Sequence, residues 1–95
     1  MTKLNFPRIR AFTVTTAAQK LLEGNAKRKA VLIYNNGTAP VELLDNKKQV
    51  YGDGIPIHAG SCYTNEHFNC QGEYWIISES ADQDVRIEED VQQDA

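Results

Sequence analysis

Apolar residues in this chain fall in short runs, and turn-forming residues separate the runs at intervals of about 8–12 residues. The clearest run is KAVLIYN at residues 29–35, and EYWIIS at residues 73–78 is the next clearest. Both are rich in β-branched and aromatic side chains, which favour strands. Residues 84–88 (DVRIE) alternate polar and apolar side chains, as a half-exposed strand does. The pattern predicts an all-β fold, a small antiparallel β-sandwich or barrel of about seven or eight short strands.

The other elements are shorter. Strands are expected at residues 11–15, 49–51 and 61–64, and at 55–58, where Pro56 indicates a sheet edge. Residues 17–23 (AAQKLLE) have helix propensity but are few, so a short helix and a strand with Leu22 facing the core both remain open. Asn36 and Gly37 form a strong turn signal, so residues 30–35 and 41–44 are expected to pair as a hairpin.

Length and composition divide the chain into one domain with two flanking segments. A chain of 95 residues forms a single domain with a thin core. Residues 1–10 contain Pro7 and show no regular period, so they are expected to form an extended N-terminal arm. Residues 11–90 would form the sandwich, and residues 91–95 an acidic tail. We see no apolar segment of transmembrane length and no secretory signal at the N-terminus.

Charge is distributed unevenly. Residues 1–29 hold seven basic residues and one acid, whereas the remainder holds three basic residues and twelve acids. A balance of +6 followed by −9 indicates either a partner of opposite sign or two oppositely charged surfaces that fold against each other. The densest basic cluster, residues 27–29, would suit a nucleic acid. Few aromatic residues accompany it and the acidic remainder would repel a polyanion, so nucleic-acid binding is not the favoured interpretation.

The sharpest candidate for a metal site is a set of two histidines and two cysteines: His58, Cys62, His67 and Cys70. Imidazole and thiolate are the ligands of tetrahedral zinc. The spacing departs from the usual signature, in which two close pairs are separated by a long loop, so free cysteines and surface histidines are the simpler expectation, and no cofactor or metal is predicted. No serine or cysteine has a recognisable base and orienting group, and no phosphate-binding loop occurs. The sequence therefore predicts a protein that is not an enzyme.

Several motifs occur in a familiar order: RKAVLIYNNG at 28–37, PVEL at 40–43, GIPI at 54–57 and DVRIEE at 84–89. This order resembles the small virion structural proteins of tailed bacteriophages. The resemblance extends over about residues 12–89. It does not include residues 1–10 or the stretch at 61–71 that holds the two cysteines.

The resemblance implies a non-enzymatic subunit of a phage particle. A capsid decoration (cement) protein that binds the lattice of the major capsid protein is the preferred role, with a homo-oligomer as the expected state. Such a protein is made in the host cytoplasm and resides in the virion. A head–tail, tail or fibre accessory protein is the alternative, and a stand-alone module for nucleic acid or carbohydrate is a further one. The expected contact residues are Phe6, Arg8 and Arg10 in the arm, with Lys27 and Arg28.

Overall fold

The computed structural model describes residues 8–92, which form eight strands and one short 3₁₀ helix. This confirms the predicted all-β sandwich. The elements are β1 (Arg8–Val14), β2 (Gln19–Leu22), β3 (Arg28–Asn35), β4 (Val41–Leu44), β5 (Ile55–Ile57), β6 (Cys62–Asn65), η1 (Phe68–Gln71), β7 (Tyr74–Ser78) and β8 (Gln83–Val91).

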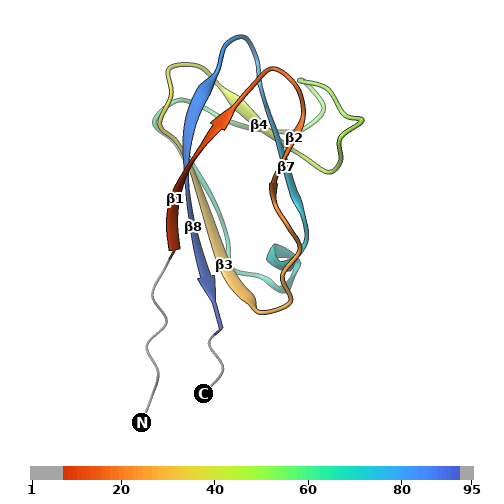
Figure 1. The fold of residues 1–95 in the computed structure, drawn as a ribbon, viewed down its shortest axis with the longest axis vertical. Coiled ribbons are helices and arrows are strands. Elements are labelled where there is room, and N and C mark those ends of the chain that lie inside the picture. Colours follow the sequence, from red (N-terminus) through yellow and green to blue (C-terminus); the bar gives the residue numbers. More distant parts are fainter. Residues whose placement is uncertain (1–7, 93–95) are drawn as a thin grey trace.

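The strands form two four-stranded antiparallel sheets that pack face to face (Figure 1). Sheet A has the order β1-β8-β3-β6, and sheet B has the order β2-β7-β4-β5. Successive strands mostly alternate between the sheets, which is the strand order of a jelly roll. Four edge strands result. β1 and β2 border one open side of the sandwich, and β6 and β5 border the other.

The predicted hairpin of residues 30–35 and 41–44 is wrong. β3 lies in sheet A between β8 and β6, whereas β4 lies in sheet B between β7 and β5. Residues 36–40 therefore cross from one sheet to the other. The strands themselves are where the sequence placed them, but their partners are different.

Two buried polar side chains explain this crossing. Asn35 donates from Nδ2 to the carbonyls of Ala39 and Ile57, at 2.8 and 2.9 Å, and accepts from Gly37 N. Gln83 Oε1 accepts from the amides of residues 38 and 39. Gly37 does not have positive φ, so the tight turn expected from Asn-Gly does not form. The glycine is needed instead for close approach, because a Cβ there would overlap the Gln83 side chain.

Two other segments differ from the sequence-based expectation, and a third decides between alternatives that the sequence left open. Residues 19–22 form strand β2 rather than a helix, which selects the second of the two alternatives; Leu22 is buried in the core. Residues 49–51 do not form a strand: residues 49 and 50 are irregular, and a turn begins at residue 51. The prediction of an arm at residues 1–10 is wrong for residues 8–10, because these pair with β8 as part of β1. Residues 1–7, including Phe6, lie outside the described residues, as do residues 93–95 of the expected tail.

The core is the layer between the two sheets. Its centre is made of aliphatic side chains from both sheets, with Val14, Ile33, Val41, Ile76, Val85 and Ile87 fully buried. These residues alternate along their strands with residues of the outer faces, as the two-residue period of a strand requires. Polar groups are buried mainly near the two ends of this layer: Asn35, Ser78 and Gln83 at one end, and Arg28 and Glu89 at the other.

The outer faces of the two sheets are treated differently. On sheet B, the outward side chains of Glu42, Leu44 and Ile77 are buried. Residues 45–54 fold against this face, because Glu42 Oε1 accepts hydrogen bonds from the amides of Gly52 and Gly54 at 2.7 and 3.1 Å. On sheet A, no described element covers the outer face.

Candidate functional site

The four residues considered as zinc ligands do not come together. Cys70 is buried in the core, and its Sγ lies 3.5 Å from the carbonyl oxygen of Arg28. Cys62 is exposed on β6, at a position that faces outward from sheet A. His58 and His67 are also exposed. Residues 8–92 contain no group of three or more His, Cys, Asp or Glu side chains placed to hold a metal ion. The zinc alternative therefore finds no support in this geometry.

Of the five residues expected to contact a partner, Arg28 is wrongly assigned. Its side chain is only 2% exposed. Lys27 beside it is exposed, and Arg10 is half exposed. Arg8 pairs with Glu89 in the β1–β8 register. A break in the alternation accounts for the burial of Arg28. The β3–β8 pairing shifts register between Arg28 and Ala30, so Arg28 lies inward although Ala30, two residues later, faces outward.

The Arg28 guanidinium donates four hydrogen bonds inside the protein. Nε donates to Glu89 Oε2 at 2.9 Å. The two terminal nitrogens donate to the carbonyls of Cys70, Gly72 and Glu23 at 2.8–3.0 Å. The other oxygen of Glu89, Oε1, forms an ion pair with Arg10 NH2 at 3.0 Å. Arg28 thus joins the β2–β3 loop, the η1 segment and β8, which makes it a structural residue.

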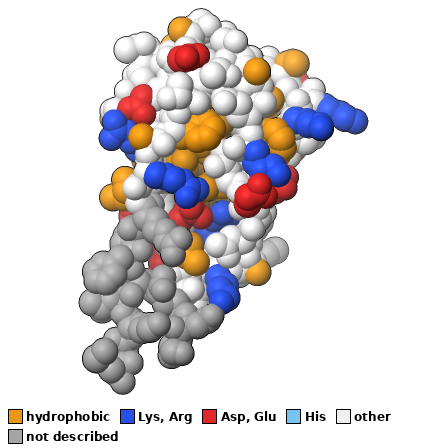
Figure 2. All heavy atoms as spheres, viewed as in Figure 1, with side chains coloured by type: hydrophobic (Ala, Val, Ile, Leu, Met, Phe, Trp, Pro, Cys, Tyr) orange, Lys and Arg blue, Asp and Glu red, His pale blue; other side chains and the backbone are white. Residues whose placement is uncertain are grey.

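The +6 and −9 halves of the chain fold against each other. Arg10 and Arg28 pair with Glu89, and Lys20 pairs with Glu73 as well as with Glu23. Figure 2 shows the result on one face, where basic and acidic side chains lie next to each other rather than in separate patches. For these residues the charge asymmetry is internal, as the second interpretation of the sequence expected.

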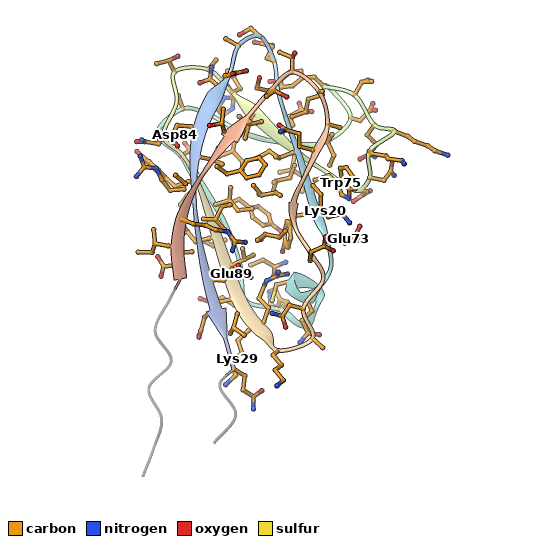
Figure 3. All side chains as sticks on the ribbon, viewed as in Figure 1. Lys20, Lys29, Glu73, Trp75, Asp84 and Glu89 are labelled. Carbon is orange, nitrogen blue, oxygen red and sulfur yellow. The ribbon has the colours of Figure 1, made fainter. Side chains whose placement is uncertain are left out.

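Trp75 lies on the outer face of sheet B within a small charged cluster, together with Lys20 and Glu73 (Figure 3). Its Nε1 donates to Glu73 Oε1 at 3.2 Å, and Lys20 Nζ lies 5.6 Å from the ring centroid and 3.2 Å from Glu73 Oε2. The hydrogen bonds from Trp75 and then Lys20 hold the pKa of the Glu73 carboxyl below its ordinary value. The contacts orient the half-buried indole, so Trp75 is not part of the sandwich core.

The outer face of sheet A is a surface that the described elements leave uncovered. Two rows of mainly apolar or small side chains border a charged row. Outward positions on β1 are Ile9, Ala11 and Thr13, and those on β3 are Ala30, Leu32 and Tyr34. Between them, β8 presents Asp84, Arg86, Glu88 and Asp90. Ile9 is 70% exposed, the highest value among the described large apolar residues.

Two grooves open on the sides of the sandwich. The groove between β1 and β2 has a volume of about 390 Å³, and its charged lining consists of Arg10, Lys20, Glu23, Arg28 and Glu89. Those charges already pair with one another. The groove between β5 and β6 has a volume of about 350 Å³ and a polar lining that includes two tyrosines. Nothing in the sequence indicated this second groove, because its lining comes from separate parts of the chain, within residues 43–55, 63–65 and 73–74.

Within residues 8–92, no helix is long and apolar enough to cross a membrane. In comparisons with known proteins, no family model, no curated protein and no solved structure matches the chain.

Proposed function

We propose that this protein is a non-enzymatic structural subunit of a tailed-phage particle, a decoration protein that binds the capsid lattice through the outer face of sheet A. Two things support the proposal. The motifs from residue 28 to residue 89 resemble those of small phage virion proteins. The outer face of sheet A is uncovered, and this observation carries the proposal.

The contrast between the two outer faces is the physical basis. On sheet B the outward Leu44 and Ile77 are buried, and residues 45–54 bond to the outward Glu42 of the same face, so this apolar surface is satisfied within the chain. Sheet A leaves Ile9 exposed and Leu32 and Tyr34 half buried, with no described element over them. These apolar side chains lie on either side of the charged row of β8. A mixture of exposed apolar and charged side chains is typical of interfaces between proteins that also exist separately.

The charged row on β8 indicates the kind of partner. Asp84 and Arg86 already bond to each other, at 2.9 Å between Oδ2 and NH2. Glu88 and Asp90 follow on the same face, so acids predominate beyond Arg86. A capsid surface that combines apolar groups with lysine or arginine would complement this arrangement. Charge complementarity of this kind sets register and association rate more than affinity.

The fold is compatible with this role but does not select it. Jelly rolls occur in viral capsid proteins and also in lectins and cupins, so function must be argued from surfaces. Small size adds a thermodynamic reason for assembly. A domain of 95 residues has a thin core, and binding to a lattice stabilises the folded state by mass action.

Co-sedimentation with purified capsids of the phage that encodes the chain tests the proposal. Ile9→Lys and Leu32→Lys place a charge on the outer face of sheet A and should weaken binding at least tenfold. Val50→Lys is the matched control. Val50 is 62% exposed and lies in residues 45–54, away from the outer face of sheet A. Urea midpoints close to that of the unmodified protein establish that each variant is folded.

The opposite pattern would count against the proposal. If both sheet A variants bind as tightly as the unmodified protein, this face is not the contact surface. If the unmodified protein does not sediment with capsids but is found at the neck or tail by immunogold labelling, the accessory role replaces the decoration role. Sedimentation of the free protein also measures whether it forms the expected homo-oligomer.

A further inference from the structure

We infer that the groove between β5 and β6 binds an uncharged sugar. This inference concerns a different surface from the outer face of sheet A and does not depend on the proposed function. It rests on the shape of the groove, on the chemistry of its lining and on one buried hydroxyl group that lacks a partner.

The groove lies where the two sheets separate at their edges. β5 borders it from sheet B, β6 borders it from sheet A, and residues 45–54 form a further wall. Its volume of about 350 Å³ is at the small end of the range for small-molecule sites, about 300–1,000 Å³. The polar groups that line it include Asp45, Gln49, Asp53, Tyr63, Asn65 and Tyr74.

The lining combines hydrogen-bond acceptors with hydrogen-bond donors. Asp45 offers carboxylate oxygens, and Asp53 offers Oδ1, because its Oδ2 accepts from Val50 N at 3.0 Å. Gln49 uses its Oε1 to accept from Asp45 N at 2.6 Å, which leaves its amide group as a donor. The Tyr63 hydroxyl accepts from Asn65 Nδ2 at 3.3 Å and keeps its own proton to donate. Sugar hydroxyls both donate and accept, so they match a mixed lining of this kind.

Other classes of ligand fit less well. No lysine, arginine or histidine lines the groove, so phosphate and other anions find no counter-charge. Its carboxylates do not converge on one point, since residues 8–92 hold no cluster of three or more acids, histidines or cysteines suited to a metal. Glu73 also lines the groove, but it already bonds Lys20 and Trp75. An uncharged polyhydroxy ligand remains.

Tyr74 supplies the independent observation. Its side chain lies in the core layer and the residue is 8% exposed, yet its hydroxyl makes no hydrogen bond of ordinary geometry, although Asn65 and Tyr63 lie near it. Leaving a buried hydroxyl unpaired is costly. The half-buried Tyr63 ring packs edge-on against it, with centroids 6.2 Å apart. Rotation of Tyr63 would expose the Tyr74 hydroxyl to a ligand hydroxyl, which would supply the missing partner.

Titration of the full chain, followed by amide chemical shifts, tests the inference. The probes are glucose, galactose, mannose and N-acetylglucosamine, each taken to about 50 mM because a small open site gives millimolar affinity. We expect at least one of them to shift the amides of residues 45, 49, 53, 63 and 65 in a saturable way. Trilysine and glucose 6-phosphate, added separately, represent cationic and anionic ligands.

Matched variants distinguish a bound sugar from a general effect. Tyr74→Phe removes only the unpaired hydroxyl, so the fold should persist while the dissociation constant rises about two- to tenfold, the value of one hydrogen bond. Asp53→Asn, which removes a charge without changing shape, should also weaken binding. Tyr34→Phe makes the same chemical change as Tyr74→Phe on the outer face of sheet A and should leave the affinity unchanged.

Three results would overturn the inference. The first is the absence of saturable shifts at the groove with all four sugars. The second is saturable binding of trilysine or glucose 6-phosphate there in place of the sugars. The third is sugar binding that Tyr74→Phe and Tyr34→Phe affect equally. Capsid binding is measured separately, so failure of this inference and failure of the proposed function give different results.

Discussion

Replacing Arg28 by methionine should be among the most damaging single substitutions in the protein. The side chain is 2% exposed and makes four hydrogen bonds, one to Glu89 and three to backbone carbonyls. Methionine fills similar space but offers no donor. The substitution removes the ion pair of the buried Glu89 carboxylate with Arg28 and leaves its ion pair with the half-exposed Arg10. Removal of one member of a buried ion pair costs about 3–5 kcal/mol.

That cost is large for a domain of this size, whose total stability is expected to be about 5–15 kcal/mol. With a urea m-value of about 1–1.5 kcal/mol per molar, the unfolding midpoint should fall by about 2–5 M. Arg28→Lys keeps the charge but cannot bridge partners on three segments, so its midpoint should lie between those of Arg28→Met and the unmodified protein. Urea titration followed by circular dichroism measures all three.

Arg86→Met is the matched control. Arg86 also bonds a carboxylate, Asp84, at 2.9 Å, but it lies on the exposed face of β8. Exposed ion pairs contribute little because water solvates both charges, so its midpoint should change little. The assignment of Arg28 as a structural residue is refuted if the two methionine variants shift the midpoint equally.

Three further predictions concern the core and the loops. With a thiol reagent, one thiol should react rapidly in the native protein, because Cys62 is exposed and Cys70 is buried; two fast thiols or none would contradict this. Gly54→Ala should cost about 1–3 kcal/mol in urea unfolding, because its Cβ would overlap a backbone carbonyl of β4, whereas Gly24→Ala meets ordinary contacts; equal effects would be inconsistent with the structure. Burial raises the pKa of Tyr74 to about 12, so between about pH 10 and 12 the unfolded chain loses this proton first, and stability should fall by about 2 kcal/mol as the pH rises. Tyr74→Phe should lack this component in urea titrations over that range, and identical pH profiles would exclude it.

Strands were predictable from the sequence because their signal is local. Apolar, β-branched and aromatic side chains predict strands at residues 29–35 and 73–78. In the structure, β3 and β7 occupy these segments and are central strands of their sheets. Pairing was not predictable in the same way. The turn signal at residues 36 and 37 is local, but the Gln83 side chain that holds the following amides comes from β8. A residue 45 positions away therefore decides that the chain crosses to the other sheet.

Candidate contact residues were harder still to predict, because net charge does not report burial. Residues 27–29 are three consecutive basic residues in the sequence, but the second is buried while its neighbours are exposed. The groove between β5 and β6 had no signal at all. Its polar residues lie in ordinary loops and strands, and only the fold brings them together.

Strand β8 shows how a thin sandwich can define a single register. Its inward positions are apolar in the middle, at Val85 and Ile87, and polar at the ends, at Gln83 and Glu89. Gln83 holds the amides of the crossing segment at one end, and Glu89 holds Arg28 at the other. A slip by one residue would turn the outward row of acids and Arg86 into the core and leave Arg28 without its carboxylate. Because unpaired buried charges are so costly, the polar ends exclude that register more strongly than the apolar centre does.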